Sequence, residues 1–113
     1  MYRKYGSRKT ECRHGHLHDS QKEAIRCNEL HLLEKAGEIK NLKQQPKFTL
    51  LEPFEYQGKK IRGITYRADF SYLDRGEFIV EDTKGYKTKE YQLKRKLLLS
   101  NMANTKNFNF IES

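Results

Sequence analysis

Residues 67–85, RADFSYLDRGEFIVEDTKG, predict two β-strands joined by a tight turn. Strand-forming residues dominate Ile61–Leu73 and Phe78–Lys84, and the DRGE segment between them, residues 74–77, has the composition of a hairpin turn. The two strands should therefore pair antiparallel, and the rest of the fold can be built outward from this hairpin.

The hairpin places acidic residues opposite each other. Whether the loop holds two or four residues, the register is the same and sets Asp69 opposite Asp82. Facing side chains have Cβ atoms about 5 Å apart, and like charges at that distance are destabilising. Lys84 lies two residues beyond Asp82 on the same strand face, so it offsets only part of the negative charge.

A bound metal ion would offset the rest of this charge. Mg²⁺ prefers oxygen ligands and is commonly held by one or two carboxylates together with waters and a phosphate group of the substrate. Two alternatives stay open: a one-residue slip would pair Asp69 with Glu81 instead of Asp82, and acids at exposed strand ends would cost little.

The flanking segments predict an α/β fold with one mixed sheet between helices. We expect the order helix, three strands, helix, strand. The segments that complete the hairpin are a helix from Ser20 to a stop at Gly37, a strand at Lys47–Leu51, a helix over Thr88–Ala103 and a strand at Phe108–Ile111. Residues 1–18 form a separate basic arm with a small hairpin around His14-Gly15, and residues 19–113 form the main domain.

Glu23 is a further candidate site residue. It shares the buried stripe of the first helix with Cys27 and Leu30 at helical spacing, where a carboxylate needs a partner. It is also the fourth residue of a capping box that begins at Ser20, and this role alone would explain it.

The positive charge is concentrated in two segments. The formal net charge is +8, of which residues 1–10 carry +4 and residues 84–96 carry +5, so the remaining residues sum to −1. Clustered cations bind polyanions because they release counterions from several phosphates together. Nucleic acid is therefore the predicted partner, against the alternative of a solvated helix face and a solubilising tail.

Other classes of protein fit poorly. The longest aliphatic run is Leu97-Leu98-Leu99, and Met1-Tyr2-Arg3-Lys4 lacks the apolar stretch of a secretory signal, so we expect a cytoplasmic protein without a membrane anchor. Cys12 and Cys27 would then be reduced thiols. A glycine-rich phosphate loop and a nucleophile elbow are absent from the sequence.

Together these residues resemble the PD-(D/E)XK nuclease superfamily. The resemblance rests on Glu23 in the first helix, Asp69 in one strand, and Asp82-Thr83-Lys84-Gly85 in the next, before a basic helix. The sequence is similar to small phage-encoded members of this superfamily and, more distantly, to phage Holliday-junction resolvases. Ala68 stands where the signature has proline.

The resemblance implies a restriction-endonuclease-like core and a Mg²⁺- or Mn²⁺-dependent DNA endonuclease acting on branched DNA in the cytoplasm of a bacterial host, with a homodimer as a further expectation. Asp69, Asp82 and the Thr83 carbonyl would bind the metal, Glu23 would complete the site and Lys84 would orient the attacking water. A non-catalytic nucleic-acid-binding module on a nuclease scaffold and a structural phage protein are the alternatives. The expected DNA contacts are Arg3, Lys4, Arg8 and Lys9 in the arm and Lys87, Lys89, Arg95 and Lys96 in the helix.

Overall fold

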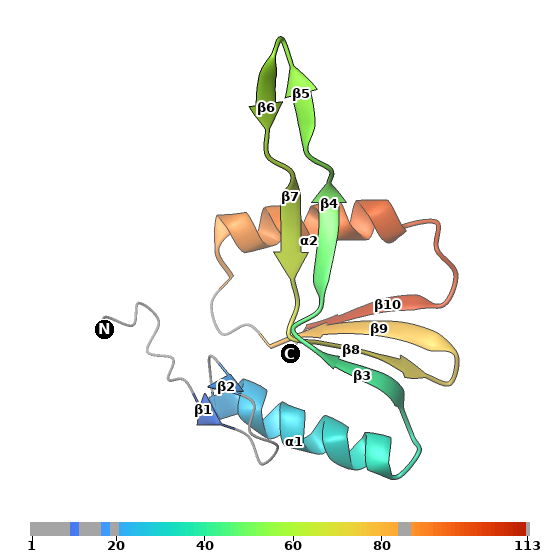
Figure 1. Ribbon diagram of the computed structural model, residues 1–113. Helices are drawn as coiled ribbons and strands as arrows, with labels where there is room; N and C mark the ends of the chain where they lie inside the picture. The colour runs from blue at the N-terminus through green and yellow to red at the C-terminus, as the bar shows by residue number, and fades with distance from the viewer. Residues whose placement is uncertain (1–9, 12–16, 19–20, 84–86, 113) are drawn as a thin grey trace.

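The computed structural model describes residues 10–11, 17–18, 21–83 and 87–112. It shows an α/β fold in which a four-stranded mixed sheet lies between two helices (Figure 1). A long two-stranded ribbon leaves the sheet and extends past one helix (Figure 1). The predicted fold class, a mixed sheet flanked by helices, is confirmed at this level.

The sheet has the strand order β10-β9-β8-β3. Strand β8 pairs antiparallel with both β3 and β9, whereas β10 pairs parallel with β9. The bounds are Lys40–Gln44 for β3, Phe70–Asp74 for β8, Glu77–Asp82 for β9 and Phe108–Glu112 for β10.

The β8–β9 hairpin has the predicted register. Its pairs run from Asp74↔Glu77 at the turn to Phe70↔Glu81 at the far end. Arg75 and Gly76 form a two-residue loop with φ values of 53° and 82°, and two positive φ values are the signature of the turn that best matches strand twist. The turn residues therefore set the pairing of the hairpin.

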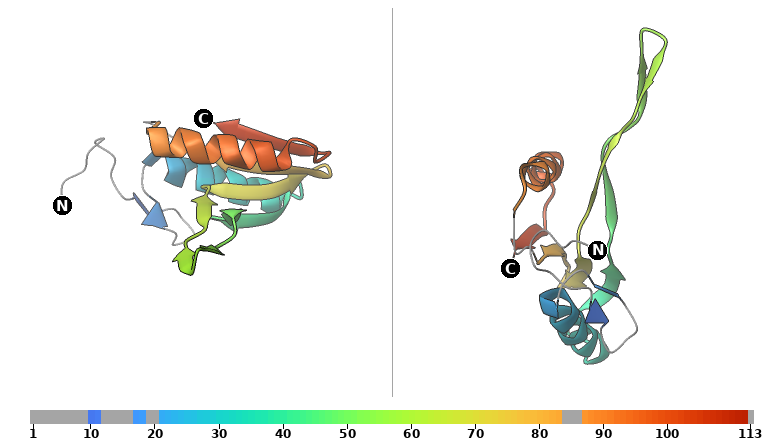
Figure 2. Two further views of the ribbon diagram at one scale, coloured as in Figure 1. Left: turned by 90° about the horizontal axis from the view of Figure 1, so that it is seen from above. Right: turned by 90° about the vertical axis from the view of Figure 1, so that its left-hand side faces the viewer.

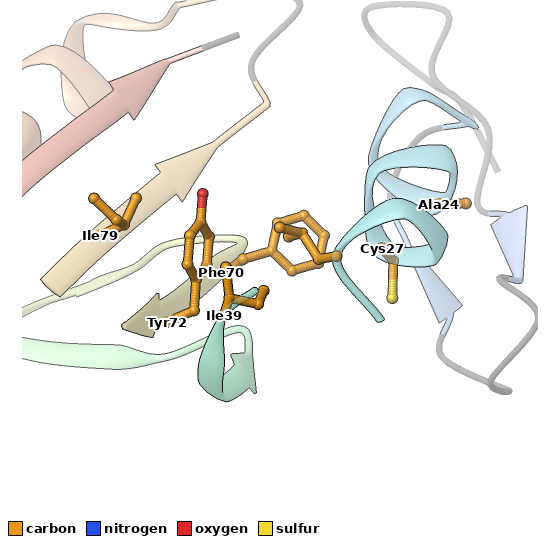
Figure 3. Close-up of a cluster of buried hydrophobic side chains, with 7 residues drawn as sticks. Ala24, Cys27, Ile39, Phe70, Tyr72 and Ile79 are labelled. Carbon is orange, nitrogen blue, oxygen red and sulfur yellow. The ribbon is translucent and has the colours of Figure 1, made fainter. Parts of the chain in front are cut away.

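Helix α1, Gln21–Lys35, packs on one face of the sheet. Its Cys27 and Leu30 lie against Phe70, Tyr72 and Ile79 of the sheet (Figure 3). As predicted, the helix ends before Gly37, whose φ of 82° suits a residue without a Cβ, and the Glu38 N–H closes the end by donating to the Leu33 carbonyl at 2.9 Å.

Helix α2, Lys89–Met102, covers the other face. The Thr88 hydroxyl accepts a hydrogen bond from the Tyr91 N–H at 3.0 Å and caps the first turn. Tyr91 and Leu98 of α2 pack with Val80 of β9 and with Tyr66 from the ribbon. The two apolar clusters thus lie on opposite faces of one sheet, and the acids at the sheet end can face either helix.

Two strand predictions need correction. The predicted strand Ile61–Leu73 is divided into three, β6 (Lys59–Ile61), β7 (Ile64–Arg67) and β8, and the predicted Lys47–Leu51, which is β4, pairs with β7 outside the sheet. The edge strand of the sheet is instead β3, which the sequence analysis missed. The observed order of elements therefore has more strands than the predicted helix, three strands, helix, strand.

These differences arise from a bend shared by the two paired segments around Gln45 and Ala68. Gln45 has a φ of 48°, which turns the chain between β3 and β4. Hydrogen bonds from the Gln45 N–H to the Asp69 carbonyl (2.8 Å) and from the Ala68 N–H to the Pro46 carbonyl (3.0 Å) carry the pairing through the bend. The result is one continuous hairpin that leaves the sheet and ends in β5 (Phe54–Tyr56) and β6.

The predicted N-terminal hairpin is present as β1 (Thr10–Glu11) paired antiparallel with β2 (Leu17–His18). Its turn at His14-Gly15 lies outside the described residues. Within the described ranges, neither helix is long and apolar enough to cross a membrane.

Candidate active site

Asp69 and Asp82 lie at the end of the β8–β9 hairpin opposite its turn. Asp69 directly precedes Phe70 and Asp82 directly follows Glu81, so both lie one position beyond the last register pair, Phe70↔Glu81. The Asp69 N–H donates to the Glu81 carbonyl at 3.2 Å. The exposed fraction is 8% for Asp69 and 0% for Asp82. Two buried acidic residues therefore lie at the same end of the hairpin, where the chain bends out of the sheet.

Thr83 holds the Asp69 carboxylate. Oδ2 of Asp69 accepts from the Thr83 N–H at 2.6 Å and from the Thr83 hydroxyl at 2.7 Å. Neither contact involves Oδ1. Hydrogen bonds that orient one oxygen of a carboxylate leave the other for a ligand, as in the outer shell of metal sites.

Tyr66 holds the Asp82 carboxylate. The Tyr66 hydroxyl donates to Oδ2 of Asp82. Burial raises the pKa of Tyr66, and the hydrogen bond to Asp82 and the charge of Asp69 raise it further. Both aspartates therefore act on one phenol group, which stays protonated and donates.

Glu81 faces the opposite side of the sheet. Arg26 of α1 contacts it through Nε and through Nη2, the latter at 3.1 Å from Oε2, and the Tyr72 hydroxyl donates to Oε2 at 2.7 Å. The Glu81 contact raises the pKa of Arg26, while burial and then the hydrogen bond to Glu81 raise the pKa of Tyr72. Glu81 thus forms a structural ion pair with α1, while Asp82 turns to the α2 face.

Glu23 is buried, with an exposed fraction of 3%, in the first turn of α1. This helix packs on the sheet face opposite the one that carries Asp82. Ser20, its predicted capping partner, and Lys84, the predicted catalytic lysine, lie outside the described residues. Arg3, Lys4, Arg8 and Lys9 of the arm lie outside them as well.

The four predicted DNA contacts of the basic segment, Lys87, Lys89, Arg95 and Lys96, fall into two groups. Lys87 Nζ lies 2.8 Å from Glu112 Oε1, and Arg95 Nε lies 3.6 Å from Glu112 Oε2 with its guanidinium over the Phe110 ring. Lys89 and Lys96 are exposed on α2 and take no part in these contacts. Only the second group is presented to solvent without an acidic partner among the described residues.

Glu112 is the residue that sequence reasoning missed. It pairs in register with Asp82 across the parallel β9–β10 ladder, and the Tyr91 hydroxyl donates to it. The hydrogen bonds from Lys87 and Tyr91 hold the pKa of Glu112 below its usual value. The alternation of Phe108, Phe110 and Glu112 could have placed it on the α2 face, but the parallel register has no local signal.

A family model described as "Protein of unknown function (DUF1064)" matches residues 2–113. The chain belongs to the DUF1064 family. Neither the curated proteins nor the solved structures contain a match to it.

The donor set in this DUF1064 member suits a hard divalent cation. Asp69, Asp82 and the Thr83 carbonyl supply oxygen only, and two carboxylates are the number with which Mg²⁺ is commonly bound. Within the described ranges, three or more His, Cys, Asp or Glu side chains do not gather in one place. Any metal held here would therefore rely on two carboxylates of the described part of the chain, plus backbone and solvent oxygens.

A pocket of about 250 Å³ lies next to these acids, between the ribbon and the start of α2. Tyr66, which contacts Asp82, and Tyr91, which contacts Glu112, both line it. Its wall also carries two cations, Arg67 and Lys94, and one acid, Glu90, whose Oε1 lies 3.1 Å from the Lys94 Nζ. A phosphate group that entered this pocket would meet Arg67, which lies two residues before Asp69 in the chain.

Proposed function

We propose that this DUF1064 member is a divalent-metal-dependent DNA endonuclease with a PD-(D/E)XK-like core, and that it cleaves branched DNA of the kind formed in phage recombination. The buried Asp69–Asp82 pair, oriented by Thr83 and Tyr66, is the single observation that carries this proposal.

The proposal follows from the cost of the pair. Two carboxylates withdrawn from water repel each other, and burying charge is costly unless it is paired or coordinates a metal. A bound Mg²⁺ or Mn²⁺ would lower the pKa of a water molecule and stabilise the charge that develops on the phosphoryl group. The acids thus have a chemical reason to be close together.

The candidate site residues have distinct roles in this proposal. Asp69 and Asp82 supply charged ligands, Thr83 fixes Asp69 through its N–H and hydroxyl, and its carbonyl is a further ligand. Lys84, two residues beyond Asp82, orients the attacking water. Glu23 has no role in this proposal, because its helix packs on the sheet face opposite the one that carries Asp82. Lys89 and Lys96 provide phosphate contacts beside the site, and the arm cations Arg3, Lys4, Arg8 and Lys9 would add further phosphate contacts.

Cleavage of a supercoiled plasmid and of a synthetic four-way junction tests the proposal. We expect nicking or resolution with Mg²⁺ or Mn²⁺ and none with EDTA. Asp82→Ala and Lys84→Ala should each abolish cleavage, whereas Asp74→Ala, which removes an acid from the other end of the same hairpin, should leave it unchanged. Equal nicking by all three variants would show that the site assignment is wrong.

Binding measured in EDTA separates the two nucleic-acid functions. A protein that retains DNA with a steep salt dependence, but cleaves under none of these metals, would be a binding module on a nuclease scaffold. Sedimentation with and without a junction tests the expected homodimer, in which two copies would present two sites to two strands.

A further inference from the structure

The tip of the ribbon stands clear of the body of the protein. Strands β4 and β7 pack on α2 through Phe48 and Tyr66, but every residue from 51 to 62 is exposed (Figure 1). Seen from the side, β5 and β6 project beyond both helices (Figure 2). A two-stranded hairpin with two wet faces gains little stability from burial, so its persistence needs another reason.

The backbone of the ribbon is shaped to project. Gln57 and Gly58 form its end turn with φ values of 50° and 76°. At the neck, where the register shifts, a Cβ on Gly63 would lie 2.3 Å from the Leu51 carbonyl oxygen, so only glycine permits the two chains to come this close. Turn and neck together define a built element rather than a loose insertion.

Aromatic side chains are presented at the tip. Phe54 and Tyr56 are 47% and 62% exposed, and they are the exposed large aromatics of the described residues. Phe54 pairs with Ile61 and Tyr56 with Lys59, so these side chains share one face of the tip. The tip therefore presents two aromatic rings and Ile61 to solvent on one face, with Lys59 beside them.

Positive charge accompanies the aromatic residues. The ribbon, residues 47–67, carries Lys47, Lys59, Lys60, Arg62 and Arg67 against two glutamates, Glu52 and Glu55. Lys47 and Arg67 are register partners, so two cations face each other directly. None of the five makes an ion pair with any described residue, so the ribbon offers positive charge to an anionic partner.

We propose that this ribbon docks on duplex DNA that flanks the cleavage point, with Lys59, Lys60 and Arg62 on phosphates and Phe54 and Tyr56 against sugars and bases. The inference rests on the proposed function for its partner. Charge complementarity favours DNA over a second copy of the chain, because the whole ribbon, residues 47–67, has five cations against two acids and a second ribbon would have the same sign. A two-stranded ribbon also has the size that the major groove admits.

The length of the ribbon gives the inference a measurable scale. The ten residue-to-residue steps from Lys47 to Gln57 span about 33 Å at about 3.3 Å per step, which is close to one helical turn of DNA. Because Tyr66 at its base contacts Asp82, the tip reaches DNA about one turn from the candidate site. The substrate must therefore extend about ten base pairs beyond the cleavage point on the ribbon side.

Fluorescence anisotropy in EDTA, with labelled duplexes of about 40 and about 10 base pairs, tests this inference. The tip variant is Lys59→Ala/Lys60→Ala/Arg62→Ala. Its matched control, Lys35→Ala/Lys40→Ala/Lys43→Ala, removes the same charge from exposed positions on α1 and β3. We expect the tip variant to bind the long duplex at least about ten-fold more weakly, with a salt slope lower by about 2.7, and the short duplex within about two-fold.

Equal weakening by the tip and control variants would overturn the inference, since net charge alone would then explain binding. Unchanged binding of the long duplex by the tip variant would also overturn it. If Phe54→Ser/Tyr56→Ser converts a dimer to a monomer in sedimentation while DNA affinity stays the same, the tip is an interface between copies instead. DNA binding that depends on the tip, without any cleavage, would support the proposed docking of the ribbon and contradict only the proposed nuclease activity.

Discussion

The two ends of the β8–β9 hairpin carry the same pattern of facing acids in opposite surroundings. At the turn, Asp74 and Glu77 are register partners and only half-buried, so water screens their repulsion. At the other end, Asp69 and Asp82 are almost fully buried and are contacted by Thr83 and Tyr66. The same local pattern is screened by water at one end and withdrawn from water at the other.

A second contrast runs through β9 itself. Glu81 and Asp82 are adjacent and both buried, but the Glu81 carboxylate pairs with Arg26 of α1, whereas the Asp82 carboxylate accepts a hydrogen bond from Tyr66 on the α2 face. The two carboxylates of β9 are therefore held by different elements, Glu81 by helix α1 and Asp82 by the ribbon. Variants that exchange these surroundings should separate the two roles.

The largest effect is expected at the buried acidic end. Asp69→Asn should lower cleavage by at least about 10³-fold, because losing a metal ligand removes more charge stabilisation than losing one hydrogen-bond donor, which already costs about 10²–10³-fold. Mg²⁺ should raise the Tm of the parent protein but not that of this variant, because binding stabilises only a state that holds the ion. Cleavage assays and thermal melts measure both.

Asp74→Asn is the matched control at the turn end. It should change neither cleavage nor the Mg²⁺-dependent rise in Tm. A variant at the turn that loses activity as fully as Asp69→Asn would remove the distinction between the two ends of the hairpin.

The ion pair on the α1 face should dominate stability. Arg26→Ala leaves the Glu81 carboxylate buried without its cation, and breaking a buried pair in this way costs about 3 kcal/mol or more in the free energy of unfolding. Urea denaturation followed by circular dichroism measures the loss. Lys22→Ala, an exposed cation on the same helix, should change stability by less than about 0.5 kcal/mol, and a similar loss in both variants would contradict the assignment.

Tyr66 and Tyr72 each donate a hydrogen bond to a buried carboxylate, Tyr66 to Asp82 and Tyr72 to Glu81. Removing each hydroxyl in turn compares a donor at the candidate site with a donor at the structural ion pair. Tyr66→Phe keeps the ring in the α2 cluster but removes the hydroxyl that orients Asp82, so cleavage should fall about 10–100-fold, as for other outer-shell partners of metal ligands. Tyr72→Phe removes the equivalent hydroxyl from Glu81 and should leave cleavage within about two-fold. Titrating Mg²⁺ in each variant shows whether metal affinity or the chemical step changes.

The smallest effect is expected at Glu112, the acid beside Asp82 on β10. Its pKa is lowered in the folded protein by Lys87 and Tyr91, so its contribution to stability is present above the unfolded pKa of about 4.3 and disappears as the pH falls through the folded value. Glu112→Gln should therefore be less stable than the parent by under about 1 kcal/mol at pH 7 and equally stable near pH 3.

Denaturation at the two pH values measures this difference. Glu90→Gln, which loses only an exposed pair with Lys94 on the same helix, should show a loss of about 0.5 kcal/mol or less. A deficit in Glu112→Gln that is larger at pH 3 than at pH 7 would show that the linkage has the wrong sign.

Local sequence was sufficient for the elements that local geometry decides. Arg75-Gly76 sets the loop, and the loop sets the β8–β9 register that brings Asp69 and Asp82 to one end. The apolar spacing and the capping residues likewise gave helices α1 and α2 to within a few residues. These features depend on residues close together in the chain, so side-chain alternation and turn conformation are enough to predict them.

Contacts between distant segments were decided only by the tertiary structure. The period of two puts Glu81 and Asp82 on opposite faces, but it cannot say which helix covers which face, and Arg26 lies 55 residues from its partner. The parallel pairing that sets Glu112 beside Asp82, the edge strand β3 and the ribbon that leaves the sheet at Gln45 have the same origin. Their energies come from packing two layers on one sheet, and no short stretch of residues contains that information.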